Sequence, residues 1–159
     1  MTDFASTALS GNMLDVAQLI TEHQSKLPVR VFTDSVSVGF SGATPASYTT
    51  VTGLSRSVDV EADDRIILLS VLNVSCGTAG DKIAAQHYND AAAAGLIYYF
   101  TEPTGQTTGD SGPLVVATLY TNRTGTIAFS TKWIRAAGAG NIYCKENSTQ
   151  FTIILKGRP

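Results

Sequence analysis

Residues 107–113, TTGDSGP, contain Gly-Asp-Ser-Gly, the four residues that surround the nucleophilic serine of trypsin-like proteases. A serine nucleophile needs a histidine base, an acid that orients this base, and an oxyanion hole. The chain offers His23 and His87, Pro113 stands where the protease motif continues with glycine, and 159 residues are too few for two barrels. The composition of residues 101–113 is typical of an exposed loop. We therefore predict a loop serine at Ser111, no catalytic residue and no enzymatic activity.

Residues 59–65, DVEADDR, are the densest group of possible metal ligands. Hard cations such as Ca²⁺ take several carboxylate oxygens, but this run lacks the glycine-containing spacing of an EF-hand loop. Acidic residues directly before a strand are ordinary turn residues. No second histidine or cysteine stands at a useful spacing from His23 or His87. We expect an ordinary turn at Asp63 and Asp64 within this run, and neither metal nor cofactor.

Cys76 and Cys144 are too few for a disulfide framework. They pair if their strands are neighbours, but free cysteine is among the most buried residue types. Buried free thiols are the preferred interpretation, and pairing stays open at this point.

Charged residues make up 15% of the chain, against roughly 25% in soluble domains. The formal net charge is -2 and no basic stripe stands out, so nucleic acid is not an expected partner. No apolar run approaches the ~18 residues of a membrane helix. The first residues carry an acid and lack a basic segment followed by an apolar one, which is not typical of a secretion signal.

A helical pattern is present in residues 12–27, NMLDVAQLITEHQSKL. Asn12 is a good N-cap, and Pro28 marks the end of the helix. The apolar stripe must pack on the same domain, on a sister chain or on a partner. It comprises Met13, Leu14, Val16, Ala17, Leu19, Ile20 and Leu27.

From Val29 onward the hydrophobic period changes to two and β-branched residues become frequent. Many short strands separated by Gly, Pro, Asn, Asp and Ser predict a β-sandwich or jelly roll. We interpret the alanines at 91–94 as a connector. The predicted strands are 29–33, 36–40, 47–52, 57–61, 65–74, 82–88, 96–100, 114–120, 126–135, 141–146 and 151–156.

Two kinds of strand are distinguishable. In 126–135 apolar and polar residues alternate, as on a sheet with one face in water, whereas 66–72, 96–100 and 114–120 are apolar on both faces. A two-layer sandwich covers one face of each sheet, so the second face of these strands needs another cover. The simplest cover is another copy of the chain, and we predict a closed homo-oligomer.

Aromatic residues are frequent in the predicted strands, where they suit either a sugar platform or the core and a subunit interface. Their strand placement favours the core and the interface. They are Tyr98, Tyr99, Phe100, Tyr120, Phe129, Trp133, Tyr143 and Phe151.

Residues 48–159 resemble the jelly-roll domains, similar to tumour-necrosis-factor and complement-C1q heads, that recur in structural proteins of tailed bacteriophages. The resemblance rests on SYTTVTGLSRSVDVEADDRIILLSVLNVSC, a short strand, a turn and an apolar strand. It rests also on TGTIAFSTKWIRAAGAGNIYCKENSTQFTIILKG, an alternating strand with a tryptophan, a small hairpin and a closing strand. Such domains form trimers, either as capsid decoration (cement) proteins or as fibre heads.

The resemblance implies an antiparallel jelly-roll β-sandwich over 28–159, preceded by an N-terminal arm and amphipathic helix over 1–27. The chain lacks a fibre shaft and a collagen-like stalk, which favours a non-enzymatic homotrimeric decoration protein on the capsid surface of a virion. Its partners are then itself and a major capsid protein, without nucleic acid or membrane. The alternative is a tail-fibre or receptor-binding head that recognises a host glycan.

Two sets of residues are assigned to these contacts. We predict the trimer interface at Leu96, Tyr98, Phe100, Leu119 and Tyr120. We predict the capsid-binding residues in the arm and helix, at Phe4, Leu9, Leu14, Leu19 and Ile20.

Overall fold

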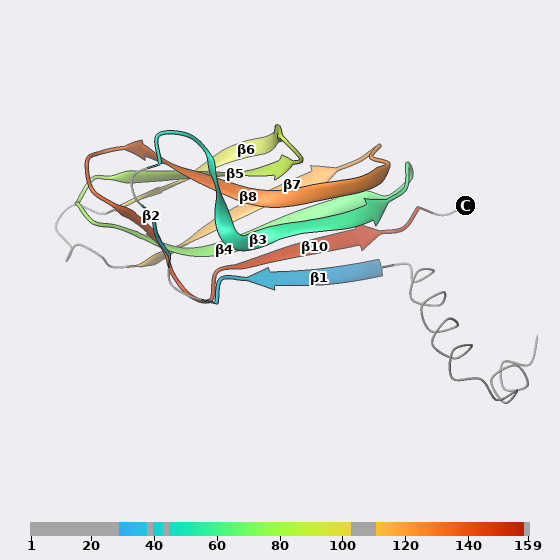
Figure 1. The fold of residues 1–159 in the computed structure, drawn as a ribbon, viewed down its shortest axis with the longest axis horizontal. Coiled ribbons are helices and arrows are strands. Elements are labelled where there is room, and N and C mark those ends of the chain that lie inside the picture. Colours follow the sequence, from blue (N-terminus) through green and yellow to red (C-terminus); the bar gives the residue numbers. More distant parts are fainter. Residues whose placement is uncertain (1–28, 38–39, 43–44, 103–110, 158–159) are drawn as a thin grey trace, which may run out of the picture.

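A computed structural model describes residues 29–37, 40–42, 45–102 and 111–157, and every regular element in these ranges is a β-strand (Figure 1). Within the same ranges there is no helix that could cross a membrane. The predicted helix at 12–27 lies outside the described residues, as do residues 103–110 of the predicted loop. The structure is therefore mainly β, as the sequence predicts.

The strands are β1 (Val29–Ser35), β2 (Phe40–Gly42), β3 (Thr49–Val60), β4 (Arg65–Cys76), β5 (Lys82–Asn89), β6 (Ala92–Thr101), β7 (Gly112–Tyr120), β8 (Gly125–Ala137), β9 (Ile142–Cys144) and β10 (Thr149–Leu155).

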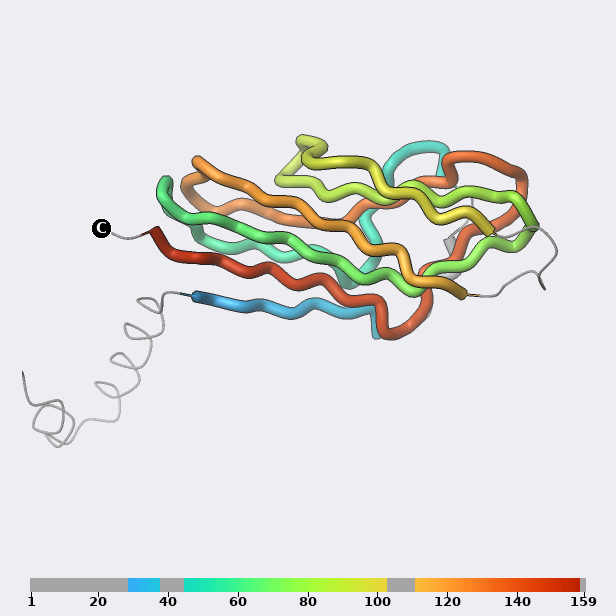
Figure 2. Tube along the Cα trace, turned by 180° about the vertical axis from the view of Figure 1, so that it is seen from behind, coloured from blue at the N-terminus to red at the C-terminus, as the bar shows by residue number. Residues whose placement is uncertain are grey.

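These strands form two antiparallel sheets packed face to face. Sheet A has the order β1-β10-β4-β7. The last residues of β4, Val74–Cys76, pair with the short β9 instead of β10, and β9 pairs in turn with β2. Sheet B has the order β3-β8-β5-β6. The chain passes from one sheet to the other at most connections, which is the jelly-roll arrangement of a sandwich. Figure 2 shows β1 (blue), β10 (red), β4 (green) and β7 (orange) side by side in sheet A.

The core lies between the sheets because alternate residues of each strand point inward. In β7 the burial alternates at every position from Pro113 to Tyr120, and β10 alternates likewise. The buried apolar side chains form two clusters. One surrounds Trp133 and Leu54 and contains both cysteines, and the other surrounds Phe129 and Tyr120.

The two open sides of the sandwich are closed by different contacts. At the β1–β3 side, Arg56 donates to both carboxylate oxygens of Asp34 at 2.6–3.0 Å. At the β6–β7 side, the hydroxyl of Tyr98 donates to the carbonyl of Ala117 at 3.1 Å. Gly95 lies so close to Thr118 that a Cβ there would be 2.4 Å from the threonine hydroxyl. This approach brings β6 against the edge of sheet A.

Three predicted boundaries are wrong for local reasons. The two strands predicted at 47–52 and 57–61 are the single strand β3, whose pairing with β8 shifts register between Thr50 and Ser55, around Gly53 at φ +88°. The segment 36–40 is not one strand, because β1 ends at Ser35 and β2 begins at Phe40.

The predicted connector at 91–94 is the third wrong boundary. β5 turns tightly at Asp90 and Ala91, with Asp90 at φ +51°, and β6 begins at Ala92. The alanines of this segment therefore form strand pairs with β5.

Candidate functional site

Ser111 is exposed and stands directly before β7. His87 lies on β5 with no exposed surface, and its ring nitrogens face Ser70 and Thr118 at 3.0 and 2.9 Å. Both ring nitrogens are thus engaged with residues other than Ser111. The second histidine, His23, lies outside the described residues. Ser111 has no base beside it in the part of the chain that the structure describes.

A layer of buried polar side chains separates the two apolar clusters. The Ser70 hydroxyl is 2.7 Å from the Thr131 hydroxyl, which donates to the amide oxygen of Gln150 at 2.8 Å. Together with His87 and Thr118, these groups link β4, β5, β7, β8 and β10. The layer pairs a serine with a histidine, but Ser70 is fully buried and no carboxylate belongs to the layer. Burial lowers the pKa of His87 to about 3, so the ring is neutral and its role is structural.

The acidic run contains the predicted turn between the end of β3 at Val60 and the start of β4 at Arg65. The backbone NH of Asp64 donates to the Glu61 carbonyl at 3.0 Å, and the Asp64 carboxylate accepts from the Glu61 NH at 3.0 Å. Burial raises the pKa of Asp64, but hydrogen bonds from Glu61, Lys156 and Gly157 outweigh it and leave this pKa below its usual value. The described residues contain no group of three side chains placed to hold a metal ion.

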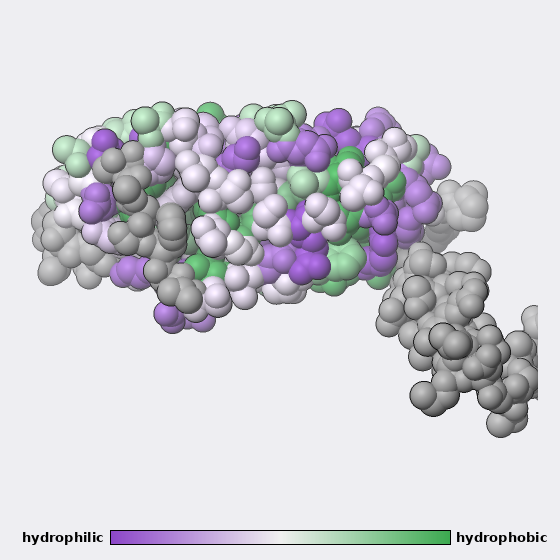
Figure 3. Space-filling view, in the orientation of Figure 1, coloured by the Kyte–Doolittle hydropathy of each residue, from purple (hydrophilic) through white to green (hydrophobic). Residues whose placement is uncertain are grey.

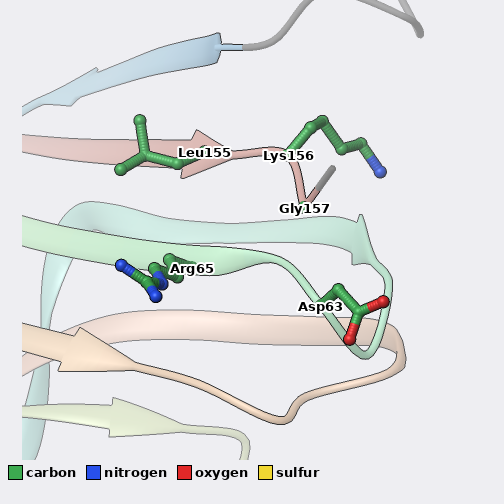
Figure 4. A pocket seen from close by; sticks show the side chains of 5 residues that line it. All are labelled: Asp63, Arg65, Leu155, Lys156 and Gly157. Carbon is green, nitrogen blue, oxygen red and sulfur yellow. The ribbon is translucent and has the colours of Figure 1, made fainter. Parts of the chain in front are cut away.

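A shallow pocket of about 670 Å³ lies beside this turn, lined by Asp63, Arg65, Leu155, Lys156 and Gly157. Figure 4 shows the side chains of Asp63 and Lys156 at one end of the pocket and Arg65 further back along β4. The Lys156 ammonium is already held by Glu61 at 2.9 Å and Asp64 at 3.1 Å. One of the two cations that line the pocket, Lys156, is thus already paired with carboxylates.

Cys76 and Cys144 are free and buried, which confirms the preferred interpretation. They lie on the neighbouring strands β4 and β9, where Val74 pairs with Cys144. Burial raises the pKa of both thiols, that of Cys76 to about 11. Since the thiolate is the nucleophile, burial acts against nucleophilic reactivity of both cysteines at neutral pH.

The outer side of sheet A is a chemically distinctive surface, which we call the apolar face. It is built from outward residues of β1, β10, β4 and β7, and all of them are exposed or half-buried. They are Val31, Ile67, Leu69, Val71, Val115, Leu119, Phe151 and Ile153.

Strand register makes the apolar face continuous. Val31, Ile153, Ile67 and Leu119 form one row across all four strands. In the neighbouring rows Phe151 pairs with Leu69 and Val71 pairs with Val115, so aliphatic or aromatic side chains adjoin in both directions. A contiguous apolar surface of this kind is typical of a protein interaction site.

The predicted trimer-interface residues fall in three environments. Leu119 is 61% exposed on the apolar face, and Leu96 is 72% exposed on β6. Tyr98 and Phe100 are half-buried and pack against the Trp133 cluster. Tyr120 is 4% exposed and contacts Phe129 in the core, with ring centroids 5.0 Å apart. Tyr120 therefore belongs to the core rather than to a surface, because it alternates with Leu119 along β7.

The predicted capsid-binding residues Phe4, Leu9, Leu14, Leu19 and Ile20 lie outside the described residues. The sequence prediction also missed the contributions of β1 and β10 to the apolar face. A signal was present in β10, where Ile153, Ile154 and Leu155 follow one another and therefore supply both faces. The alternation in β1 gave no indication that its outer side adjoins β10.

No protein-family model matches the sequence, and no curated protein matches it. Among solved structures, a VP2 subviral particle protein of infectious bursal disease virus is 16% identical with a TM-score of 0.52. The match covers 81% of this chain and 33% of that one. Eiger TNF from S. frugiperda is 10% identical with a TM-score of 0.51, covering 83% of this chain and 95% of that one.

The chain thus shares its fold with a viral particle protein and with a TNF protein, and it spans about a third of the viral protein's length. At these identities the likeness concerns the fold alone.

Proposed function

We propose that this chain is a non-enzymatic structural protein of a virus particle, a homotrimeric decoration (cement) protein on an assembled bacteriophage capsid. The observation that carries the proposal is the apolar face, which the described residues of the sandwich leave exposed or half-buried. The likeness of fold to a viral particle protein supports a location in a virus particle. The resemblance to phage decoration proteins supports the proposed role on a capsid.

The apolar face gives the reason for self-association. One row alone places Val31, Ile153, Ile67 and Leu119 next to one another, with Val31 and Leu119 more than half exposed. Burying apolar area contributes about 25 cal/mol per Å², so a second copy on this face gains a large favourable term. The domains that this chain resembles form trimers. A trimer has closed rotational symmetry, so its growth stops at three chains and does not continue into a filament.

Attachment to the capsid is assigned to residues 1–27. The described chain begins at Val29, on the edge strand of sheet A, where Val29 pairs with Leu155. A trimer supplies three such segments, and three weak contacts to a quasi-symmetric surface combine into tight attachment through effective concentration. The assigned partner is the major capsid protein, and the location is the outer surface of the virion.

The absence of catalysis is part of the proposal. The serine–histidine contact of Ser70 and His87 is closed to solvent, and the Cys76 thiol is protonated at neutral pH. A protein of this kind needs neither cofactor nor metal for its role.

The proposal is tested first by light scattering of the isolated protein. A homotrimer gives about three times the chain mass of 16.7 kDa. A stable monomer at micromolar concentration contradicts it.

Attachment is tested by adding the full chain, or a chain without residues 1–27, to capsids stripped of the protein. The full chain should add back to the capsids, whereas the shortened chain should remain a folded trimer and stay in solution. If the shortened chain unfolds, the segment belongs to the core and the assignment is wrong.

A further inference from the structure

The outer side of sheet B carries a cluster of aromatic and cationic side chains, which we call the tyrosine patch. It consists of Tyr48, directly before β3, Tyr88 on β5, Tyr99 on β6, and Lys132 on β8. The rings of Tyr48 and Tyr88 lie with centroids 5.9 Å apart at 50°. The Lys132 ammonium lies 4.1 Å from the centroid of Tyr88.

Register places these residues on one face. Tyr99 pairs with Ala84, and Lys132 pairs with Gln86, two positions further along β5. Strand spacing of about 4.8 Å and a rise of about 3.3 Å per residue put the Cα atoms of Tyr99 and Lys132 about 12 Å apart. Burial raises the pKa of Tyr48, and the nearby Tyr88 and Tyr99 raise it further.

The residues at the base of the patch are buried, whereas Tyr99 above them is exposed. Ala84 and Gln86 point to the outer side of sheet B, yet they are only 2% and 8% exposed. The Gln86 amide donates to the Gly95 carbonyl at 3.0 Å and is thereby fixed. Tyr99, by contrast, is 60% exposed, so a flat aromatic ring is available beside a rigid surface.

The positive charge of the patch, on Lys132, has no salt-bridge partner among the described residues. The salt bridges in the described ranges involve Arg56 and Lys156, and Lys132 makes none. Its stacking on Tyr88 fixes the position of the ammonium and leaves its charge free for an anion. A basic track of the kind that follows a nucleic-acid backbone is missing from a chain whose net charge is -2.

We propose that the tyrosine patch binds an acidic oligosaccharide, with a sugar ring stacked on Tyr99 and a carboxylate or other anionic substituent at Lys132. The apolar faces of sugar rings suit aromatic rings, and their hydroxyl edges suit tyrosine hydroxyl groups. Because sheet B lies opposite the apolar face, self-association through sheet A leaves the patch accessible. Several patches on one oligomer then add their weak affinities.

The test uses the full chain with a C-terminal peptide tag, applied to a surface printed with sialylated, uronate-containing and neutral oligosaccharides and with oligothymidylate. We expect binding to acidic sugars above neutral ones. Tyr99→Ala and Lys132→Gln should each lower that signal at least tenfold. Tyr99→Phe keeps the ring and should retain most of the signal, and Lys82→Gln, which removes an exposed charge on the same sheet, should retain all of it.

Three results overturn the proposal: acidic sugars bound no better than neutral ones, binding unchanged in Tyr99→Ala and Lys132→Gln, or preference for oligothymidylate. Thermal melting of each variant separates loss of binding from loss of fold, and the exposed Tyr99 should be replaceable without lowering the melting temperature. These results are independent of capsid attachment, which is measured on stripped capsids.

Discussion

The outer sides of the two sheets differ although both are made by alternating strands. On sheet A the outward row Val31–Ile153–Ile67–Leu119 is entirely aliphatic. On sheet B the outward positions of β3 and β8 bring together polar or small side chains in the pairs Ser57–Ala128 and Asp59–Thr126. Figure 3 shows the side of the molecule viewed in Figure 1, where pale and purple residues predominate and green ones are scattered.

This difference indicates that the outer side of sheet A is the one suited to a protein contact. Inward residues of both sheets must be apolar or hydrogen-bonded because they share one core. The outward residues, which alternate with them, can suit either water or a protein partner. Along β3 and β8 of sheet B these positions carry polar or small side chains, and the exposed Ile97 and Tyr99 lie on its edge strand β6. In sheet A the middle rows of outward residues are apolar. Single exposed apolar residues are common on protein surfaces, but a continuous apolar face is typical of a site of contact with another protein.

The largest expected effect comes from placing a charge on the apolar face. Leu119→Asp should dissociate the proposed oligomer, because a carboxylate buried without a partner costs about 3 kcal/mol or more. The measurement is the mass by light scattering, which should fall from a multiple of 16.7 kDa to a single chain.

The matched control is Ser57→Asp, which adds the same charge on the outer side of sheet B, where Ser57 is exposed. The oligomer should persist in this variant. Dissociation by Ser57→Asp with an intact Leu119→Asp oligomer would reverse the assignment of the two faces. Tyr98→Asp, in contrast, should destabilise the fold, since Tyr98 packs on the core and bonds to Ala117.

A smaller effect concerns the interior that both faces share. Burial lowers the pKa of His87 to about 3 from an ordinary value of 6.5, so the unfolded chain binds a proton below pH 6.5 and the folded chain does not. Stability is therefore full above pH 6.5 and is lost as the pH falls, at about 1.4 kcal/mol per unit, until about pH 3. At pH 4.5 the loss should be about 3 kcal/mol.

Denaturant unfolding of the wild type and of His87→Gln between pH 7 and 4.5 measures this effect. Glutamine keeps a polar group near Ser70 and Thr118 without titrating, so its stability should depend less on pH. Equal pH dependence in both proteins would remove His87 as the cause.

The smallest expected effect is at Ser111. Ser111→Ala should change the free energy of unfolding by less than about 0.5 kcal/mol and should leave the oligomer unchanged, because the residue is exposed at the start of β7. Denaturant unfolding and light scattering measure both. Hydrolase activity that disappears in this variant would restore the protease hypothesis.

Much of the fold was accessible from the sequence because hydrophobic alternation reports strands directly. The strands β4, β7, β8 and β10 lie where the pattern predicts them. Apolar residues on both sides of β4 and β7 also indicated an uncovered face. The pattern failed where backbone geometry departs from regular pairing. Gly53 carries an irregularity inside β3, and Asp90 adopts a left-handed turn that lets the following alanines pair with β5.

Hydrophobic alternation also does not decide which of two adjacent apolar residues lies at the predicted interface. Leu119 and Tyr120 are adjacent and both apolar, so the sequence does not tell which of them points outward. Register with β4 decides, since Leu119 pairs with Ile67 on the outer side and Tyr120 with Ile66 on the inner side. The buried layer of Ser70, His87 and Thr131 was missed altogether, because these residues lie on different strands and nothing in their spacing links them.

The sequence by itself determined the class of this protein: β-strands by their period, a sandwich by the number of strands, and an excess of apolar strand faces over what a sandwich covers. The tertiary structure alone decided how these faces combine. Only the order β1-β10-β4-β7 joins separate aliphatic positions into one apolar face, and only the order β3-β8-β5-β6 gathers Tyr88, Tyr99 and Lys132 on the opposite side. The physical reason is that alternation is local, whereas the neighbours of a side chain across a sheet come from distant parts of the chain.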